Sequence, residues 1–143
     1  MRPEPTVAAY HHTLRVYWED TDAGGIVFYA NYLKFFERAR TEWLRSLGVG
    51  QQALREATGG MFVVSETQVR YHRPARLDDQ LRVTAALVSG GKASLEIGQQ
   101  AWRLDESGQA VELLCEGTIR IGWVDAARLR PARIPLHILE KLA

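Results

Sequence analysis

The longest regular pattern of apolar and polar positions runs over residues 31–47 and has the period of an α-helix. Apolar side chains recur there three or four positions apart, the spacing of one helical face. The members of this face are Tyr32, Phe35, Phe36, Ala39, Trp43, Leu44 and Leu47. We expect Asn31 to cap the helix and Gly48 to end it. Because four aromatic rings on one face are too much apolar surface to leave in water, a sheet is expected to cover them.

Most of the remaining chain alternates between apolar and polar residues, as β-strands do. Strands are predicted at residues 13–18, 61–71, 80–88, 93–103 and 111–124, and short helices at 51–57 and near the C-terminus. Gly90-Gly91 and residues 105–109 predict hairpins between the last three strands. One long helix on five antiparallel strands is an α+β arrangement that covers one face of the sheet. We therefore expect a second copy of the chain to cover the rest.

Length and composition indicate one folded domain, because 143 residues with 46% hydrophobic content can bury a substantial core. Residues 1–11 hold two prolines and no apolar period, so a flexible N-terminal arm is expected there, followed by a single domain over residues 12–143. The lone cysteine, Cys115, lies in an apolar run and is expected to be a buried, inert thiol.

Charge and hydropathy narrow the choice of partners and location. A formal net charge of +1 gives no basic field for a nucleic acid. No run approaches the roughly 20 apolar residues of a membrane span, and the N-terminus has no signal-peptide pattern. A cytoplasmic protein with no integral membrane segment is therefore expected.

The turn before the long helix, EDTDAGG at residues 19–25, is the candidate for chemistry. Paired glycines let the backbone bring N–H groups close to a ligand, and a helix N-terminus adds partial positive charge. A carboxylate beside such donors suits acyl transfer, in which the donors hold the oxyanion and the carboxylate attacks or activates water. The same residues also suit a turn in which Asp20 and Asp22 only shape the backbone. The pattern alone leaves both interpretations open.

Other kinds of site fit the sequence poorly. Counted from Asp20, a calcium loop would need a bidentate glutamate where the chain has Asn31. No serine-nucleophile elbow, zinc-binding motif or phosphate-binding glycine loop occurs, and the four histidines are scattered. We therefore expect no metal, with Asp22 as the first candidate for the catalytic residue and Asp20 as the second.

Two blocks of the sequence resemble the 4-hydroxybenzoyl-CoA thioesterase family. The first reads YWEDTDAGGIVFYANY and continues in FFERARTEWLR; the second is VRYHRPARLDD at residues 69–79. Ser94-Leu95 also matches, and the likeness is greatest to acyl-CoA thioesterases associated with the Tol-Pal system. The resemblance implies a hotdog fold, a five-stranded antiparallel sheet wrapped around one long central helix. It also implies a homodimer or homotetramer with active sites between subunits.

The resemblance further implies roles for individual residues. Asp22 matches the catalytic carboxylate, acting as nucleophile or general base. The main-chain N–H of Tyr29, where several relatives carry histidine, matches the donor that polarises the thioester carbonyl, and Gly25 is expected to help hold the oxyanion. Val63 and Val64 are expected to come from the partner subunit and line the acyl pocket.

The implied reaction hydrolyses acyl-CoA to a free carboxylic acid and CoA, so coenzyme A is part of the substrate and no cofactor is needed. Basic residues should meet the CoA phosphates. The candidates are Lys92 with Ser94 beside it, and Arg73, Arg76, Arg128 and Arg133. Two alternatives stay open: hydrolysis of an acyl group on acyl carrier protein, and a non-catalytic module that binds acyl-CoA or joins an envelope complex.

Overall fold

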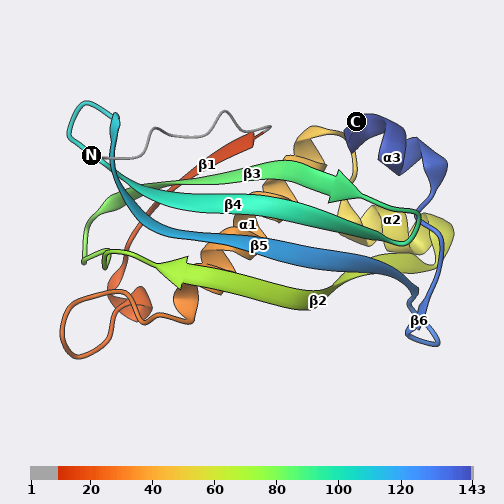
Figure 1. Cartoon of the computed structure of the whole chain (residues 1–143), viewed down its shortest axis with the longest axis horizontal. Helices are drawn as coiled ribbons and strands as arrows, with labels where there is room; N and C mark the ends of the chain where they lie inside the picture. Colours follow the sequence, from red (N-terminus) through yellow and green to blue (C-terminus); the bar gives the residue numbers. More distant parts are fainter. Residues whose placement is uncertain (1–9, 143) are drawn as a thin grey trace.

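The computed structural model describes residues 10–142, which form an antiparallel sheet with its helices gathered against one face (Figure 1). The strands run β1-β3-β4-β5-β2 across the sheet, and a short sixth strand pairs with β5. The strands are β1 Tyr10–Arg15, β2 Gly60–Tyr71, β3 Gln80–Gly90, β4 Ser94–Leu104, β5 Ala110–Asp125 and β6 Arg130–Pro131. The five predicted strands and the α+β arrangement are confirmed, and β6 is an addition.

The first strand is shifted relative to the prediction. Tyr10 and His11 pair with Ala85 and Thr84 of β3, so these two residues belong to the sheet and not to a flexible arm. The other residues of the expected arm, 1–9, lie outside the described residues. The strand ends at Arg15, and residues 18–20 form a 3-10 turn, η1 (Trp18–Asp20).

The long helix α1, Asn31–Ser46, lies behind the sheet in the view of Figure 1 and packs chiefly on β1, β3 and β4. Six of its seven predicted apolar positions are buried, and Leu47, just beyond the helix, is partly buried. Gly48 ends the helix with a φ of 80°, a left-handed conformation that glycine adopts without strain.

The sheet is not evenly covered. Two short helices, α2 (Gln51–Thr58) and α3 (Leu136–Leu142), lie near the C-terminal end of α1, and α2 packs on β2. β2 pairs only with β5, so among the described residues its other edge has no strand partner. The part of β2 near Tyr71 therefore lies beside the start of α1 at an open edge of the sheet.

Candidate active site

The turn at residues 20–30 is held by its own backbone. Thr21 and Val27 form an isolated antiparallel bridge. The N–H of Asp22 donates to the carbonyl of Ile26 at 2.9 Å, and the N–H of Gly25 donates to the carbonyl of Asp22 at 3.0 Å. Gly25 has a φ of 79°, so a residue with a side chain would be strained there. These bonds place Asp22 at the base of a tight exposed turn.

The carboxylate of Asp22 is exposed, and within residues 10–142 only one of its oxygens accepts a hydrogen bond. Oδ1 accepts a hydrogen bond from the N–H of Gly24 at 2.8 Å. Oδ2 accepts none from residues 10–142. The bond to Gly24 is the turn-shaping contact that the sequence left open, yet it leaves one charged oxygen available to a substrate or a water molecule.

The carboxylate of Asp20, unlike that of Asp22, is not exposed. Its side chain is buried, and Oδ2 accepts from the N–H of Tyr17 at 2.9 Å. Its carbonyl accepts from the N–H of Phe28 at 3.0 Å and from Nδ2 of Asn31 at 2.8 Å. Asp20 therefore holds the turn together, and Asp22 is the aspartate open to a ligand.

The prediction that Asn31 caps the long helix is wrong. Ala30 occupies the cap position without a side-chain hydrogen bond, and Asn31 is the first helical residue. An asparagine before a run of helical apolar positions normally indicates a cap, but here Nδ2 reaches back to the carbonyl of Asp20. The side chain ties α1 to the turn.

The main-chain donors of the turn differ in availability. The N–H of Phe28 donates to Asp20 and that of Asn31 to Phe28, whereas the N–H of Tyr29 donates to no atom in the described part of the chain. Gly25 already uses its N–H within the turn. The structure thus leaves Tyr29 with a free donor and gives Gly25 a role in shaping the backbone.

An aromatic cluster that the sequence did not indicate surrounds Tyr29. The centroid of its ring lies 4.9 Å from that of Phe28 and 6.1 Å from that of Tyr71, which in turn lies 5.6 Å from that of Tyr32. The hydroxyl of Tyr32 accepts from the N–H of Ala75 at 2.9 Å, and burial raises the pKa of Tyr32 to about 12. Tyr32 therefore stays neutral at physiological pH and anchors the segment after β2.

The segment after β2 also supports the turn through the backbone. The N–H of Val27 donates to the carbonyl of Ala75 at 2.9 Å, and that of Leu77 to the carbonyl of Gly25 at 3.4 Å. The two blocks of sequence that carry the family resemblance are therefore neighbours in space, although the residues that bond to each other are some fifty positions apart in the chain.

Apolar side chains are exposed on the turn, at the start of α1 and along the edge strand β2. They are Phe28, Tyr29, Leu33, Val64 and Tyr71, and we call this set the edge patch. Val64 is opposite buried Ile121 in the register and so points to the α1 side, whereas Val63 is opposite Gly122 and points to the other side. Only Val64 of the two predicted pocket residues thus belongs to the patch.

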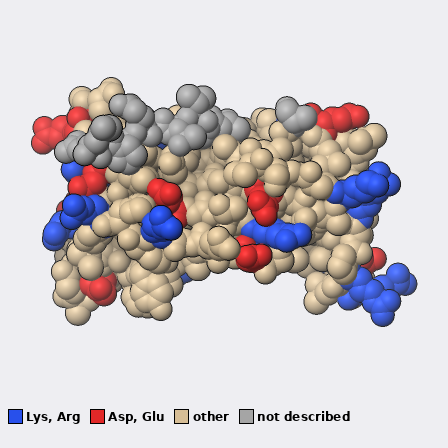
Figure 2. All heavy atoms as spheres, viewed as in Figure 1, with Lys and Arg blue, Asp and Glu red and all other residues tan. Residues whose placement is uncertain are grey.

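The predicted phosphate-binding residues do not come together with Asp22 in one chain. Lys92 and Ser94 lie at the hairpin between β3 and β4, at the opposite end of the sheet from the turn (Figure 1). Arg128 and Arg133 flank β6 at that same end, while Arg73 and Arg76 follow β2 near the turn. Figure 2 shows Lys and Arg side chains projecting at both ends of the molecule.

Two other predictions concern single groups. Cys115 is buried, and burial raises the pKa of its thiol to about 12, so it is an unreactive core residue as predicted. Phe36, predicted on the apolar face of the long helix, is also fully buried in the core. Within residues 10–142, no helix is long and apolar enough to cross a membrane, and no group of histidine, cysteine and carboxylate side chains could hold a metal ion.

Comparison with known proteins places this geometry in a family. A model of the thioesterase-like superfamily matches residues 16–142. The acyl-CoA thioester hydrolase YbgC of Escherichia coli is 40% identical over 128 residues, which are 90% of this chain and 91% of that protein. The acyl-CoA thioesterase YbgC of Haemophilus influenzae is 38% identical over 125 residues, 87% of this chain and 88% of that protein.

A solved structure shows the fold independently. A 4-hydroxybenzoyl-CoA thioesterase mutant, complexed with 4-hydroxybenzoyl-CoA, superposes with a TM-score of 0.85 over 93% of this chain and 97% of that one. The sequences are 19% identical, so this match carries the fold alone. The hotdog arrangement of long helix and curled antiparallel sheet is confirmed.

Proposed function

The chain belongs to the thioesterase-like superfamily, and we propose that it hydrolyses the thioester of acyl-CoA with Asp22 as the catalytic carboxylate. The observation that carries the proposal is the exposed carboxylate of Asp22 on a turn that also presents the N–H of Tyr29; in the described part of the chain, neither Oδ2 of Asp22 nor this N–H has a hydrogen-bond partner. The relatives whose names identify them as acyl-CoA thioesterases match nine-tenths of the chain. Their likeness therefore includes the turn.

The proposed reaction uses the main-chain N–H of Tyr29 and the carboxylate of Asp22. The N–H of Tyr29 donates to the carbonyl oxygen of the thioester, and the positive end of the α1 dipole lies beside it. Oδ2 of Asp22 then either attacks the carbonyl carbon, expelling the CoA thiolate and forming an anhydride that water cleaves, or removes a proton from the attacking water. Both routes give a free carboxylic acid and CoA.

Thiol release tests the proposal. A panel of acyl-CoA esters with short, long and aromatic acyl groups should give free CoA thiol, detected with a disulfide reagent. The best ester then defines the acyl group that the site accepts. No thiol release from any CoA ester or carrier-protein ester would overturn the proposed activity in favour of a binding module.

We predict that Tyr29→Phe retains wild-type activity. The proposed donor is the main-chain N–H, which this substitution keeps, and phenylalanine preserves the ring contacts with Phe28 and Tyr71. Turnover should stay within about twofold of wild type, because the donor is kept. Loss of an oxyanion donor would instead lower kcat on the order of 100-fold or more. A tenfold fall in kcat would instead assign the phenol itself a role in the reaction.

We also propose that the active unit contains a second copy of the chain. The open edge of β2 and the exposed edge patch support this, since apolar surface of this kind normally meets a partner. A two-fold axis beside β2 would run the two β2 strands antiparallel. The end of one sheet that carries Lys92 and Ser94 would then approach the partner's turn, which would bring the predicted phosphate-binding residues near Asp22.

Val64→Glu should therefore disrupt the assembly. A carboxylate on the edge patch would be buried without a partner at the proposed interface, which is strongly unfavourable. Light scattering coupled to gel filtration should show a smaller species, and turnover should fall with it. Val88→Glu is the matched control, because Val88 is also an exposed strand valine but lies on β3, away from β2. Equal masses for both variants and wild type would contradict the proposed interface.

Acyl carrier protein is the second candidate for the acyl donor. Three arginines, Arg73, Arg76 and Arg103, line a hollow that begins directly after β2, beside the loop that anchors the turn. Such a surface suits an acidic partner, although Asp79 and Glu112 lie in the same hollow. Measuring one acyl group on CoA and on carrier protein separates the two donors through the ratio of kcat/KM values.

We propose a cytoplasmic location for the protein. A cytoplasmic site suits a CoA ester as substrate and the free thiol of Cys115. Association with the Tol-Pal system stays a prediction that rests on the sequence resemblance alone.

A further inference from the structure

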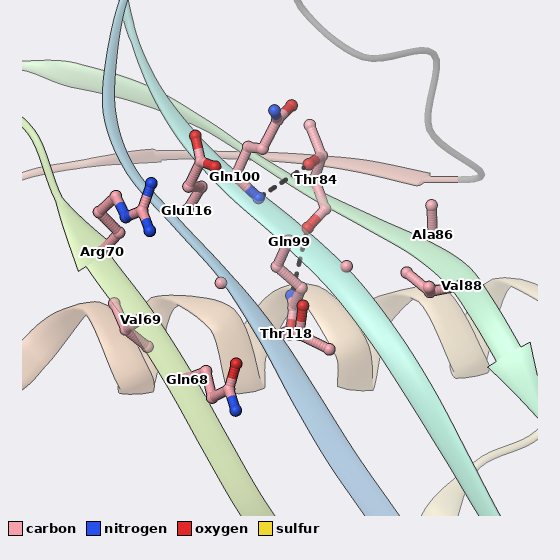
Figure 3. Close-up of a pocket in the computed structure, with 12 residues that line it drawn as sticks. Gln68, Val69, Arg70, Thr84, Ala86, Val88, Gln99, Gln100, Glu116 and Thr118 are labelled. Carbon is pink, nitrogen blue, oxygen red and sulfur yellow. Dashed lines mark hydrogen bonds between the residues drawn. The ribbon is translucent and has the colours of Figure 1, made fainter.

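Polar side chains bond to the backbone at one point in the middle of the β3–β4 ladder. Val83 pairs with Ala101 and Ala86 pairs with Gly98 on either side of this point. Between these pairs (Figure 3), the N–H of Gln100 donates to Oγ1 of Thr84 at 3.0 Å, and Nε2 of Gln99 donates to the carbonyl of Thr84 at 3.2 Å. The side chains of Thr84 and Gln99 therefore link β3 to β4 at this point.

Gln99 also holds the long helix. Its side chain is 1% exposed and faces α1, where Nε2 donates to the carbonyl of Phe36 at 2.9 Å. Oε1 accepts from Nη1 of Arg40, also at 2.9 Å. Phe36 and Arg40 lie one helical turn apart. One buried amide therefore connects β4 to two successive turns of α1.

The hydrogen bonds of Gln99 constrain the axial position of α1 more specifically than apolar packing does. The face of α1 is otherwise lined by apolar side chains, whose burial has no directional requirement. A buried amide is unfavourable unless its donors and acceptor are satisfied, so only one axial position of α1 meets the requirements of Gln99. Burial lowers the pKa of the Arg40 guanidinium, which shows that this cation also lies in a poorly solvated place.

The axial position of α1 is coupled to the catalytic turn. Nδ2 of Asn31, the first helical residue, donates to the carbonyl of Asp20, and its N–H donates to Phe28. Asp22 lies on the part of the turn that bonds to Ala75 and Leu77 after β2, and Tyr32 of α1 reaches the same segment through its hydroxyl. A shift of α1 would therefore reach the N–H of Tyr29 and the carboxylate of Asp22 through different bonds, and so change their spacing.

We propose that Gln99, acting through Phe36 and Arg40, is a positioning residue that sets the axial position of α1 and so the spacing of the Tyr29 N–H and the Asp22 carboxylate. The inference rests on the proposed function, because it concerns the geometry of that site. It predicts that the hydrogen bonds of Gln99 affect kcat, and not the stability of the fold or KM.

The test is the double variant Gln99→Leu with Arg40→Met. Replacing both polar partners by apolar side chains of similar size leaves no buried charge unpaired, so the melting temperature should stay near that of wild type. Loss of the axial constraint should lower kcat by about 10- to 100-fold, the effect of a displacement on the order of 1 Å, with KM within about twofold. A wild-type kcat in this variant would overturn the proposal.

Two further variants keep the result interpretable. Arg40→Met alone removes one of the two helical contacts and should give an intermediate loss of kcat; a wild-type kcat would count against the proposal even if the double variant failed to fold. Thr84→Val is the matched control, because it removes Oγ1 at the same point of the β3–β4 ladder but keeps the carbonyl that accepts from Gln99. It should lower the melting temperature and leave kcat unchanged, and an equal fall in kcat would assign Gln99 a merely structural role. Full activity of Asp22→Asn would instead refute the proposed function itself.

Discussion

Asp22→Asn should abolish thioester hydrolysis while the protein stays folded. The amide oxygen of asparagine can still accept the hydrogen bond from Gly24, so the turn keeps its shape. A neutral amide can neither attack the thioester nor take a proton from water, and loss of such a group costs on the order of 1,000-fold or more in kcat. The measurement is thiol release at saturating acyl-CoA, with circular dichroism and a melting curve on the same preparation.

Asp20→Asn is the matched control for this prediction. Asp20 lies two residues away, but its buried carboxylate serves the N–H of Tyr17 and not the ligand side of the turn. Its replacement should appear mainly as a lower melting temperature, with kcat well above that of the Asp22 variant. Full turnover in Asp22→Asn would refute the assignment, and equal losses in both variants would show that the two aspartates act as a unit.

The helices and strands of this fold could be predicted because the side chains that they bury recur at regular spacings in the sequence. The face from Tyr32 to Leu44 has the helical period, and those side chains are the ones that α1 buries. The strand limits differ mostly by one or two residues. The exception is β1, where Tyr10, His12 and Leu14 continue the alternation toward the N-terminus while prolines further upstream suggested a longer unstructured arm.

The contacts that could not be predicted are those between polar residues far apart in the chain. Asn31 has the sequence context of a helix cap, and only the folded turn places Asp20 within reach of its side chain. Gln99 occupies an inward position of β4, where alternation alone predicts an apolar residue, and its partners Phe36 and Arg40 lie some sixty residues earlier. Local patterns carry no information about such pairs.

Only part of the candidate site could be predicted from the sequence. Asp22 and Tyr29 lie in one continuous block whose resemblance is long and specific, and the structure leaves both with a free group. Ser94 belongs to a pair that matches the family and Lys92 was chosen for its charge, but a single chain holds both at the β3–β4 hairpin, at the far end of the sheet from the turn (Figure 1). Whether they reach the turn depends on the position of a second chain, which a sequence specifies only through the surfaces that it leaves exposed.

Phe35→Ala should cause a large loss of stability. The ring is fully buried, packs edge-on against Tyr32 at 5.8 Å between centroids, and lies under the guanidinium of Arg38 at 6.0 Å. Removing a buried phenylalanine ring costs about 3–5 kcal/mol, because apolar surface is lost and a cavity remains. Since a domain of this size has a total stability of about 5–15 kcal/mol, the variant should unfold at a much lower urea concentration.

Lys34→Ala is the control for this loss, because Lys34 is the adjacent residue on the same helix and its side chain is exposed. Its effect should be within about 0.5 kcal/mol, since exposed substitutions rarely change the free energy of unfolding by more. Equal urea midpoints for the two variants would mean that the aromatic face of α1 contributes little to folding. A midpoint lowered only by Phe35→Ala would show that the core under α1 holds the helix, and thereby the turn that carries Asp22, against the sheet.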